Sequence, residues 1–373
     1  MMDILLVSPG FPPDRTGGIE NYVRMMYNEM CRRGHNVSVL TQYYRRRVGI
    51  PAVAQVSTPK GEASGYAQWA IKGWVRASLT NADVIHFNGF QGNILSLTPI
   101  PRVPKVVHVH NSLTMEPGYY QKVVHRHKLG YLIASRAYRN ATRVVAPTQV
   151  VKQDLIEHVK GIDPGRIKVI PNCIDTEYYR PNGNRSEVRD RYSLGNKFVI
   201  LYFGKIKRTK GIETICKAYE ILRRKIDTAL IIGGAATTTN TFLNYLKATY
   251  RDAIFTGFVD DPRKYYVAAD AFSIYTSGFD GGEVFPIALL EAMSMGLPVA
   301  CPESPIFREI TRGNALFGEP ENPESLARAL LRLAEDGSMA KKQGVENRRL
   351  AQGEYDSRRV ADLLEATYRE VLQ

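Results

Sequence analysis

Short apolar runs and amphipathic stretches alternate along the first part of the chain. Residues 3–8 are mainly apolar, which is typical of a buried strand, and a loop rich in proline and glycine follows. From Ile19 to Met30 apolar residues recur every three or four positions, and Gly34 ends this helical pattern. Residues 37–40 are again strand-like. This order of elements predicts a βαβ unit, and hence an α/β fold with a parallel, doubly wound sheet.

The same order recurs in the second half of the chain. Residues 198–203 are wholly apolar, a turn with Gly204 and several basic residues follows, and a helix is predicted from Ile212. The polar stretch 178–196 reads as a linker with a short helix. The repeat predicts two Rossmann-like domains.

Three other segments are less regular. Residues 42–65 lack periodicity, which predicts a solvated loop. Residues 66–81 predict a helix with Trp69 and Trp74 on one side, and we expect both tryptophans to lie in the core. Residues 119–140 form a basic amphipathic stretch that contains aromatic residues. Such a stretch fits either a helix lying on a membrane surface or an ordinary helix with one solvated face.

Composition limits the class of protein. The 373 residues, 44% of them hydrophobic, are enough for two domains with sizeable cores. No apolar run is long enough to predict a membrane-spanning helix, and the first residues lack the features of a signal peptide. The cysteines are scattered and form no C-x-x-C pair, which predicts free thiols, a cytoplasmic location and no structural zinc. They are Cys31, Cys173, Cys216 and Cys301.

The positive charge is concentrated in the first half. The formal net charge is +13, and residues 1–170 hold 22 Lys and Arg against 10 Asp and Glu. This asymmetry favours an anionic partner for the first half, either nucleic acid or an acidic membrane surface, although it also serves solubility. The chain has no recognisable helix-turn-helix, zinc or RNA-binding motif, so we expect no nucleic-acid partner.

Polar residues end two predicted strands of the first half. Residues 83–88 finish at Asn88, and residues 105–111 contain His108 and His110 on one face of the strand. Ligands of open α/β sheets bind beyond the carboxyl ends of the strands. The two histidines suggest a metal site, but no third ligand has suitable spacing, so we expect none.

A loop and helix in the second half carry two acids. Glu283 precedes a predicted helix that begins at Pro286, contains Glu291 and ends at Gly296. The free N–H groups of a helix N-terminus favour a phosphate. By spacing alone, however, the acids also fit a capping residue and a solvated helix face.

The sequence from Glu283 to Val299 resembles the signature of the family-four retaining glycosyltransferases, a GT-B group that includes phosphatidylinositol mannosyltransferases and sucrose synthases. The resemblance implies two facing Rossmann-like domains with a cleft between them. Residues 1–177 would form the acceptor-side domain, to which a C-terminal helix, 358–373, returns. Residues 178–357 would bind the nucleotide sugar.

The resemblance, together with the strand ends, assigns roles to individual residues. It implies catalytic roles for His110 and Glu283, contact with the donor diphosphate for Gly17, Gly18, Lys205, Lys210, Phe285 and Pro286, nucleoside binding for Gly233, Val259 and Glu291, and positions on the acceptor side of the cleft for Asn88 and Asn172. The chain departs from the family at three positions. Lys205 replaces an Arg, Cys173 replaces a Gly in the loop after Asn172, and Pro286 removes one backbone donor.

The resemblance implies a metal-independent, retaining transfer of a hexose from a UDP- or GDP-linked sugar to a hydroxyl of a glycan or of a polyprenyl- or phospholipid-linked acceptor. No cofactor is expected. The basic first half adds an anionic membrane surface as a partner, with the protein peripheral on the cytoplasmic face. A GT-B nucleotide-sugar epimerase is the alternative. A nicotinamide-dependent oxidoreductase is excluded because the G-x-G-x-x-G fingerprint is missing.

Overall fold

The protein consists of two compact units, residues 1–173 with 356–373 and residues 174–355. The sequence analysis placed the corresponding boundaries at residues 177 and 358. The computed structural model describes residues 1–14, 17–43, 48–57, 63–78, 81–100, 103–110, 130–235, 241–276 and 284–373. Each unit is described by itself.

The described part of the first unit is built on a parallel sheet of seven strands in the order β3-β2-β1-β4-β5-β6-β7. The strands are β1 (Asp3–Ser8), β2 (Asn36–Tyr43), β3 (Val53–Ser57), β4 (Val84–Asn88), β5 (Lys105–His108), β6 (Arg143–Ala146) and β7 (Ile167–Val169). The helices with assigned bounds are α1 (Gly18–Arg32), α2 (Ala63–Ser78), α3 (Gly89–Ser96), α5 (Gln149–His158) and α14 (Ser357–Leu372), with a 3-10 turn, η1 (Pro164–Arg166). Residues 130–140 are also helical.

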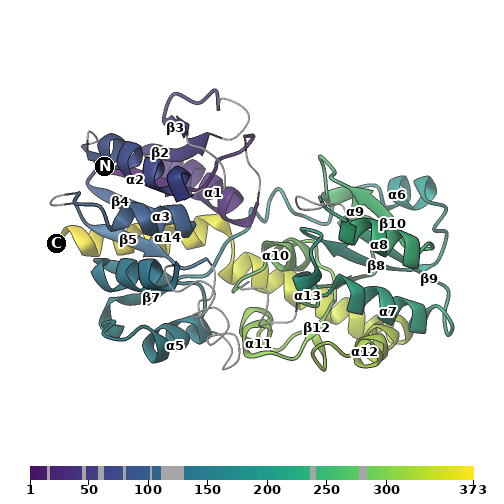
Figure 1. The fold of residues 1–373 in the computed structure, drawn as a ribbon. Coiled ribbons are helices and arrows are strands. Elements are labelled where there is room, and N and C mark those ends of the chain that lie inside the picture. Colours follow the sequence, from purple (N-terminus) through teal and green to yellow (C-terminus); the bar gives the residue numbers. More distant parts are fainter. Residues whose placement is uncertain are drawn as a thin grey trace. The chain divides into compact units, whose positions relative to one another are not determined.

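Helices cover both faces of this sheet. Alternate residues of the central strands, such as Ile4 and Leu6, join a buried cluster with Met26 of α1 and Leu364 of α14. The opposite face packs against α2 and α3. Figure 1 shows the C-terminal helix, in yellow, lying among the elements of the first unit. The last helix, which the sequence analysis expected to return to the first domain, belongs to the first unit.

The described part of the second unit contains a parallel sheet of six strands in the order β10-β9-β8-β11-β12-β13. The strands are β8 (Phe198–Phe203), β9 (Thr228–Gly233), β10 (Ile254–Gly257), β11 (Ala271–Ser273), β12 (Val299–Pro302) and β13 (Leu316–Gly318). The helices are α6 (Arg185–Arg191), η2 (Arg208–Lys210, a 3-10 turn), α7 (Ile212–Leu222), α8 (Thr241–Thr249), α9 (Arg263–Ala268), α10 (Ile287–Ser294), α11 (Pro305–Thr311), α12 (Pro323–Glu335) and α13 (Gly337–Glu354).

Side chains of the helices also pack on both faces of the sheet in the second unit. Apolar residues of α7 and α12, including Ile215 and Leu330, pack with Ile200 and Leu230 of the central strands. On another side of the sheet, the Tyr266 ring of α9 stacks on Phe203 of β8 with 5.6 Å between the ring centroids. No helix in the described residues is both long and apolar enough to cross a bilayer.

Both sheets share one strand order. In each unit the first strand lies between the second and the fourth, so the order reverses on either side of β1 and of β8. This is the doubly wound Rossmann order, and ligands of such sheets bind at the carboxyl ends of the strands beside the reversal. The predicted fold class, an α/β protein with two Rossmann-like domains, is confirmed.

Three details of the sequence analysis were wrong. The predicted loop 42–65 contains the edge strand β3. Pro286 is the residue before α10 rather than part of its first turn. Trp69 is fully buried as expected, but Trp74 is 37% exposed. The basic stretch from Tyr119 to Leu129 and the arginines at 45–47 lie outside the described residues.

Candidate functional site

In the first unit, a histidine and an asparagine meet at the carboxyl ends of β4 and β5. Asn88, the last residue of β4, lies with its Oδ1 atom 2.9 Å from Nε2 of His110. The Nδ2 atom of Asn88 donates to the carbonyl oxygens of Val7 and His86. The amide is therefore oriented with its oxygen toward His110, which makes Nε2 of His110 the donor. Its Nδ1 atom is left as a hydrogen-bond acceptor.

Three histidine rings form a stack behind this pair. His110 lies on His108 with 4.1 Å between the ring centroids, and His108 lies on His86 at 5.5 Å. The ring of Tyr22 on α1 makes T-shaped contacts with both His108 and His110. At the far end, the Nδ1 atom of His86 is 2.7 Å from the hydroxyl of Tyr368 on α14. The C-terminal helix thus supports the histidine stack from within the first unit.

Burial keeps these histidines neutral. Loss of solvent lowers the pKa of His86 and of His110 to about 3. The pKa of His108 is also lowered well below its usual value, first by burial and then by the two neighbouring rings. Among the described residues, no group of three His, Cys, Asp or Glu side chains could hold a metal ion. A stack of parallel rings does not point its nitrogen atoms at one common centre.

The other predicted residues of the first unit occupy the same sheet edge or helix ends near it. Gly17 caps α1, and Gly18 is its first residue. Gly89, directly after Asn88, has φ +71°, and a Cβ atom there would lie 3.1 Å from the Pro9 ring in the loop after β1. The loops after β1 and β4 are therefore in direct contact. Asn172 is buried beyond the carboxyl end of β7, the last strand of the sheet.

In the second unit, glycines bring the loops after three strands together. A Cβ atom on Gly234, after β9, would lie 1.8 Å from the carbonyl oxygen of Gly204, after β8. A Cβ atom on Gly211, which has φ +62°, would lie 1.8 Å from the carbonyl oxygen of Tyr275, after β11. Only glycine fits these contacts. The carboxyl ends of β8, β9 and β11 thus form one crowded edge at the point where the strand order reverses.

The two predicted phosphate-binding lysines lie in this glycine-lined turn. Lys205 follows Gly204 directly, and its carbonyl oxygen accepts a hydrogen bond from the Tyr202 hydroxyl at 3.1 Å. Lys210 ends η2 and immediately precedes Gly211. The side chain of Lys205 is exposed, and that of Lys210 is half-buried. This turn, residues 204–211, is called the lysine turn below. It presents two cations where a Rossmann-like sheet binds its ligand.

The structure describes only some of the site residues predicted at the start of α10 and in the loop before it. Glu283 lies outside the described residues. Phe285 is buried and packs edge-on against Tyr355, and Pro286 leads directly into α10. Glu291 lies on the second turn of that helix. The first N–H groups of α10 therefore come after Pro286, from Ile287 onward.

Glu291 accepts hydrogen bonds from two tyrosine hydroxyls. The hydroxyl of Tyr179 is 3.0 Å from Oε1, and that of Tyr266 is 2.7 Å from Oε2. Burial raises the pKa of Glu291, although these two bonds lower it in part. A carboxylate has about four acceptor positions, so two remain for another donor such as a sugar hydroxyl.

Gly233 and Val259 lie at the carboxyl ends of the neighbouring strands β9 and β10. Gly233 ends β9, and a Cβ atom there would clash with the Phe203 ring at 2.4 Å. Val259 follows β10 and is partly exposed, and the Phe258 side chain beside it is 67% exposed. Within the second unit, the predicted nucleoside residues thus lie at the carboxyl edge or on the adjoining α10.

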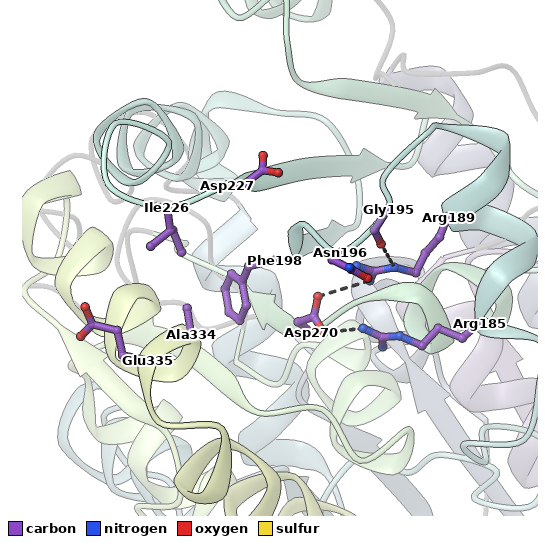
Figure 2. Close-up of a pocket in the computed structure, with 10 residues that line it drawn as sticks. All are labelled: Arg185, Arg189, Gly195, Asn196, Phe198, Ile226, Asp227, Asp270, Ala334 and Glu335. Carbon is purple, nitrogen blue, oxygen red and sulfur yellow. Dashed lines mark hydrogen bonds and ion pairs between the residues drawn. The ribbon is translucent and has the colours of Figure 1, made fainter.

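A pocket of about 400 Å³ lies elsewhere in this unit, beside Phe198 at the amino-terminal end of β8. Figure 2 shows Arg185 and Arg189 directed at the carboxylate of Asp270. Arg189 also donates to the carbonyl oxygens of Gly195, Ala268 and Lys197. This pocket is on the edge of the sheet opposite the lysine turn, and its arginines serve a network within the protein.

Sequence reasoning missed four residues that support the predicted site: Tyr179, Tyr266, His86 and Tyr368. Tyr368 and His86 are 282 positions apart, and Tyr266 and Glu291 are 25 apart. No local pattern marks such pairs. Of the four, only His86 could have been found from the sequence, because it lies two positions before Asn88 and therefore on the same face of the strand.

Two family models match the chain and together span most of it. Residues 16–178 match Glycosyltransferase Family 4, and residues 184–350 match Glycosyl transferases group 1. The chain therefore belongs to the glycosyltransferases that combine a family 4 domain with a group 1 domain. The predicted family is confirmed, and neither the epimerase nor the nucleic-acid alternative is favoured.

Individual proteins agree with this assignment. An uncharacterized glycosyltransferase of Methanocaldococcus jannaschii is 25% identical over 366 residues, which cover 90% of each chain. A GDP-mannose-dependent alpha-(1-6)-phosphatidylinositol monomannoside mannosyltransferase of Mycobacterium tuberculosis is 24% identical over 331 residues, 82% of this chain and 81% of that one. The crystal structure of Anabaena HepE, in complex with UDP and glucose, has a TM-score of 0.82 at 19% identity, covering 99% of this chain and 100% of that one. The fold is thus that of the GT-B glycosyltransferases.

Proposed function

We propose that the protein transfers a hexose from a UDP- or GDP-linked sugar to a hydroxyl group of a glycan or a lipid-linked acceptor, with retention of the anomeric configuration. The M. tuberculosis relative is named as GDP-mannose-dependent, and HepE has been solved with UDP-glucose. Both support a nucleotide-sugar donor. Within this chain, the observation that carries the proposal is the glycine-lined turn with Lys205 and Lys210 at the strand reversal of the second unit.

In this proposal the lysine turn stabilises the leaving group. Negative charge builds on the diphosphate as its bond to the sugar breaks. Lys205, Lys210 and the N–H groups at the start of α10 would neutralise that charge from fixed positions. Gly17 and Gly18 at the start of α1 would approach the same diphosphate. Because protein cations do this work, the reaction would need no metal ion.

The sugar would be held by uncharged and acidic acceptors. His110 stays neutral because its pKa is about 3, so its Nδ1 atom accepts a hydrogen bond from a sugar hydroxyl at working pH. Glu283 would bind further hydroxyls. Retention would follow from a front-face reaction, in which the acceptor attacks on the side of the departing diphosphate. The diphosphate itself would then take the acceptor's proton, and no protein nucleophile is required.

The remaining residues would select the nucleoside and the acceptor. Glu291, held by two tyrosine hydroxyls, would accept hydrogen bonds from the ribose, while Gly233 and the backbone at Val259 would contact the base. Asn88 and Asn172 would lie on the acceptor side. The four free thiols fit a reducing cytoplasm, and the basic first half fits a peripheral position at an anionic membrane face.

Transfer is tested by incubating the protein with UDP-glucose and with GDP-mannose, each together with a polyprenyl-diphosphate-linked sugar, phosphatidylinositol or a soluble glycan. We expect one donor to release its nucleoside diphosphate only when an acceptor is present, and EDTA to leave the rate unchanged. The one-bond and vicinal NMR couplings of the product should show the donor's anomeric configuration. Conversion of the donor to an isomeric sugar without transfer would instead identify an epimerase.

A further inference from the structure

An arginine of the lysine turn lies on two aromatic rings of α8. Arg208 is the first residue of η2, and its Cζ atom is 4.7 Å from the ring centroid of Phe242 and 5.5 Å from that of Tyr245. The two rings are three positions apart on α8 and stack with 6.2 Å between their centroids. A guanidinium group within about 6 Å of a ring centroid is attracted to the face of the ring. Both rings therefore hold the Arg208 side chain.

A glutamate of α7 completes this contact. Oε2 of Glu213 lies 3.7 Å from Nη1 of Arg208, and Oε1 accepts a hydrogen bond from the Tyr245 hydroxyl at 3.1 Å. The Lys217 amine, one turn further along α7, is 3.2 Å from the same Oε1 atom. Glu213 thus joins the lysine turn, α7 and α8 through both of its carboxylate oxygens.

The cluster lies at the surface and is not part of the core. The Arg208 side chain is 69% exposed, and Tyr245 is 40% exposed. Other residues attach the two helices to the sheet, among them Ile215 of α7 and Leu246 of α8, which are fully buried in the apolar cluster. An exposed ion pair contributes little to the stability of a fold. The cluster instead restricts the movement of the turn to which Arg208 belongs.

The position of Lys210 depends on this turn. Lys210 is the last residue of η2, and the N–H group of the following Gly211 donates to the Arg208 carbonyl oxygen at 3.2 Å. Gly211 itself is packed against the carbonyl oxygen of Tyr275. The short segment that carries Lys210 is therefore held at its end by the glycine contact and at its start by the Arg208 side chain.

We propose that Arg208 is a positioning residue: anchored on the two rings of α8, it keeps the Lys210 amine where the donor diphosphate binds. This inference rests on the proposed function of the lysine turn. Arg208 does not itself bind the diphosphate, because its charge is paired with Glu213 and its guanidinium group lies on the rings. A cation that is already ordered binds an anion more tightly, since no further ordering is needed on binding.

Calorimetric titration with UDP-glucose and GDP-mannose tests the ring contact. For the donor that binds the wild type, Arg208→Gln should weaken binding about fivefold, and Phe242→Leu, which keeps the apolar volume but removes the ring face, about threefold. Arg208→Lys keeps the charge without the planar stacking group and should lie between the wild type and Arg208→Gln. In steady-state kinetics Arg208→Gln should raise the donor KM more than it lowers kcat. A purely structural role would lower the melting temperature instead, and we expect that temperature to stay unchanged.

A double-mutant cycle tests whether Arg208 acts through Lys210. In a protein that carries Lys210→Gln, the further substitution Arg208→Gln should cause no additional loss of donor affinity, because the side chain that Arg208 positions is already absent. If Arg208 contacted the diphosphate directly, the two losses of affinity would multiply.

The matched control is Arg223→Gln. Arg223 also lies over an aromatic ring, that of Tyr219 at 5.6 Å, and pairs with Asp252, but it is at the end of α7 that is remote from the lysine turn. This variant should bind the donor as the wild type does. The proposal is overturned if Phe242→Leu binds as tightly as the wild type, or if the losses from Arg208→Gln and Lys210→Gln multiply. Absence of donor binding to the wild type would overturn the proposed function, and the positioning role with it.

Discussion

Nε2 of His110 donates to Oδ1 of Asn88 at 2.9 Å, and this bond joins the carboxyl ends of two neighbouring parallel strands. The asparagine amide is itself fixed by two backbone carbonyl oxygens. Its orientation therefore decides which nitrogen of the histidine carries the proton. The family resemblance assigns His110 to the donor sugar. The tautomer of this histidine is thus set by Asn88 at the end of β4.

Removing the asparagine should impair catalysis through the histidine. Asn88→Ala leaves Nε2 of His110 without this acceptor, and we expect kcat to fall about 10- to 100-fold with a small change in the donor KM. His110→Ala should cost at least as much. Because the two residues act as one unit, the double variant should be no slower than His110→Ala. Asn36→Ala, at the start of β2, is the control; independent, additive losses would contradict the coupling.

The histidine stack makes the first unit sensitive to acid. His86 and His110 have folded-state pKa values of about 3, below the usual 6.5. Once the pH falls below about 6.5, the unfolded chain therefore binds more protons than the folded protein does. The contribution of these histidines to the free energy of unfolding is thus complete above that pH and is lost toward pH 3. Each histidine should contribute roughly 1.4 kcal/mol of lost stability per pH unit.

Urea unfolding followed by tryptophan fluorescence measures this effect, since both tryptophans are in the first unit. Between pH 6 and 4.5, His86→Gln should flatten the decline in unfolding free energy by roughly 1.4 kcal/mol per pH unit. The control His158→Gln, on α5 outside the stack, should not reproduce this change. An unchanged slope in His86→Gln would mean that the stack does not titrate as described.

Glu291 should govern recognition of the ribose. Glu291→Gln removes the charge, but its amide oxygen can accept from one of the two tyrosine hydroxyls, Tyr179 or Tyr266, and its amide nitrogen can donate to the oxygen of the other, so the fold should persist. We expect nucleoside diphosphate binding, measured by calorimetry, to weaken about tenfold, consistent with one lost charge-assisted hydrogen bond. Pyrophosphate binding should not change. Tyr266→Phe should have a smaller effect, with Tyr192→Phe as control.

The decisive comparison for Glu291 uses a nucleotide without ribose hydroxyls. The wild-type protein should bind the ordinary nucleoside diphosphate more tightly than its 2′,3′-dideoxy analogue, and Glu291→Gln should bind the two alike. If Glu291→Gln kept the full preference for ribose, the residue would have only a structural role with its two tyrosines.

The Asp270 network should affect stability without affecting activity. Asp270 accepts from Arg189 and from the backbone N–H of Val199, and it lies at the edge of the sheet opposite the lysine turn. Asp270→Asn leaves the nearly buried Arg189 without its counter-ion, so we expect a loss of about 3 kcal/mol in stability. Arg185→Gln, at the more exposed partner, should cost under about 1 kcal/mol. Thermal unfolding and kcat/KM separate the two effects; a fall in kcat/KM in a folded Asp270→Asn protein would contradict this.

The architecture was accessible to sequence reasoning because it depends on local patterns. Apolar runs such as residues 198–203 predict buried parallel strands, and the glycines after them predict close turns. The strand β3 was missed because it is short, lies at the sheet edge and has its two buried residues, Val53 and Val56, three positions apart instead of at the two-residue period of a strand. The core assignment of Trp74 failed because α2 is apolar on two faces, and periodicity does not tell which face is covered.

The site was accessible only where a resemblance named its residues. Lys205, Lys210 and Gly233 are placed by the turns that follow strands, so their neighbourhood could be predicted. The partners of Glu291 could not, because Tyr179 is 112 positions away and belongs to no motif. The same is true of Tyr368, whose contact with His86 depends on the return of the last helix to the first unit.

In the proposed function, the lysine turn of the second unit binds the donor diphosphate. This binding is measured by calorimetric titration of the wild type, Lys205→Gln, Lys210→Gln and the control Lys207→Gln with UDP-glucose and GDP-mannose. We predict that one donor binds the wild type and Lys207→Gln equally, and that Lys205→Gln and Lys210→Gln each bind it at least tenfold more weakly, as expected for the loss of a hydrogen bond to a charged group. Wild-type affinity in both Lys205→Gln and Lys210→Gln, or no binding of either donor to the wild type, would contradict the claim.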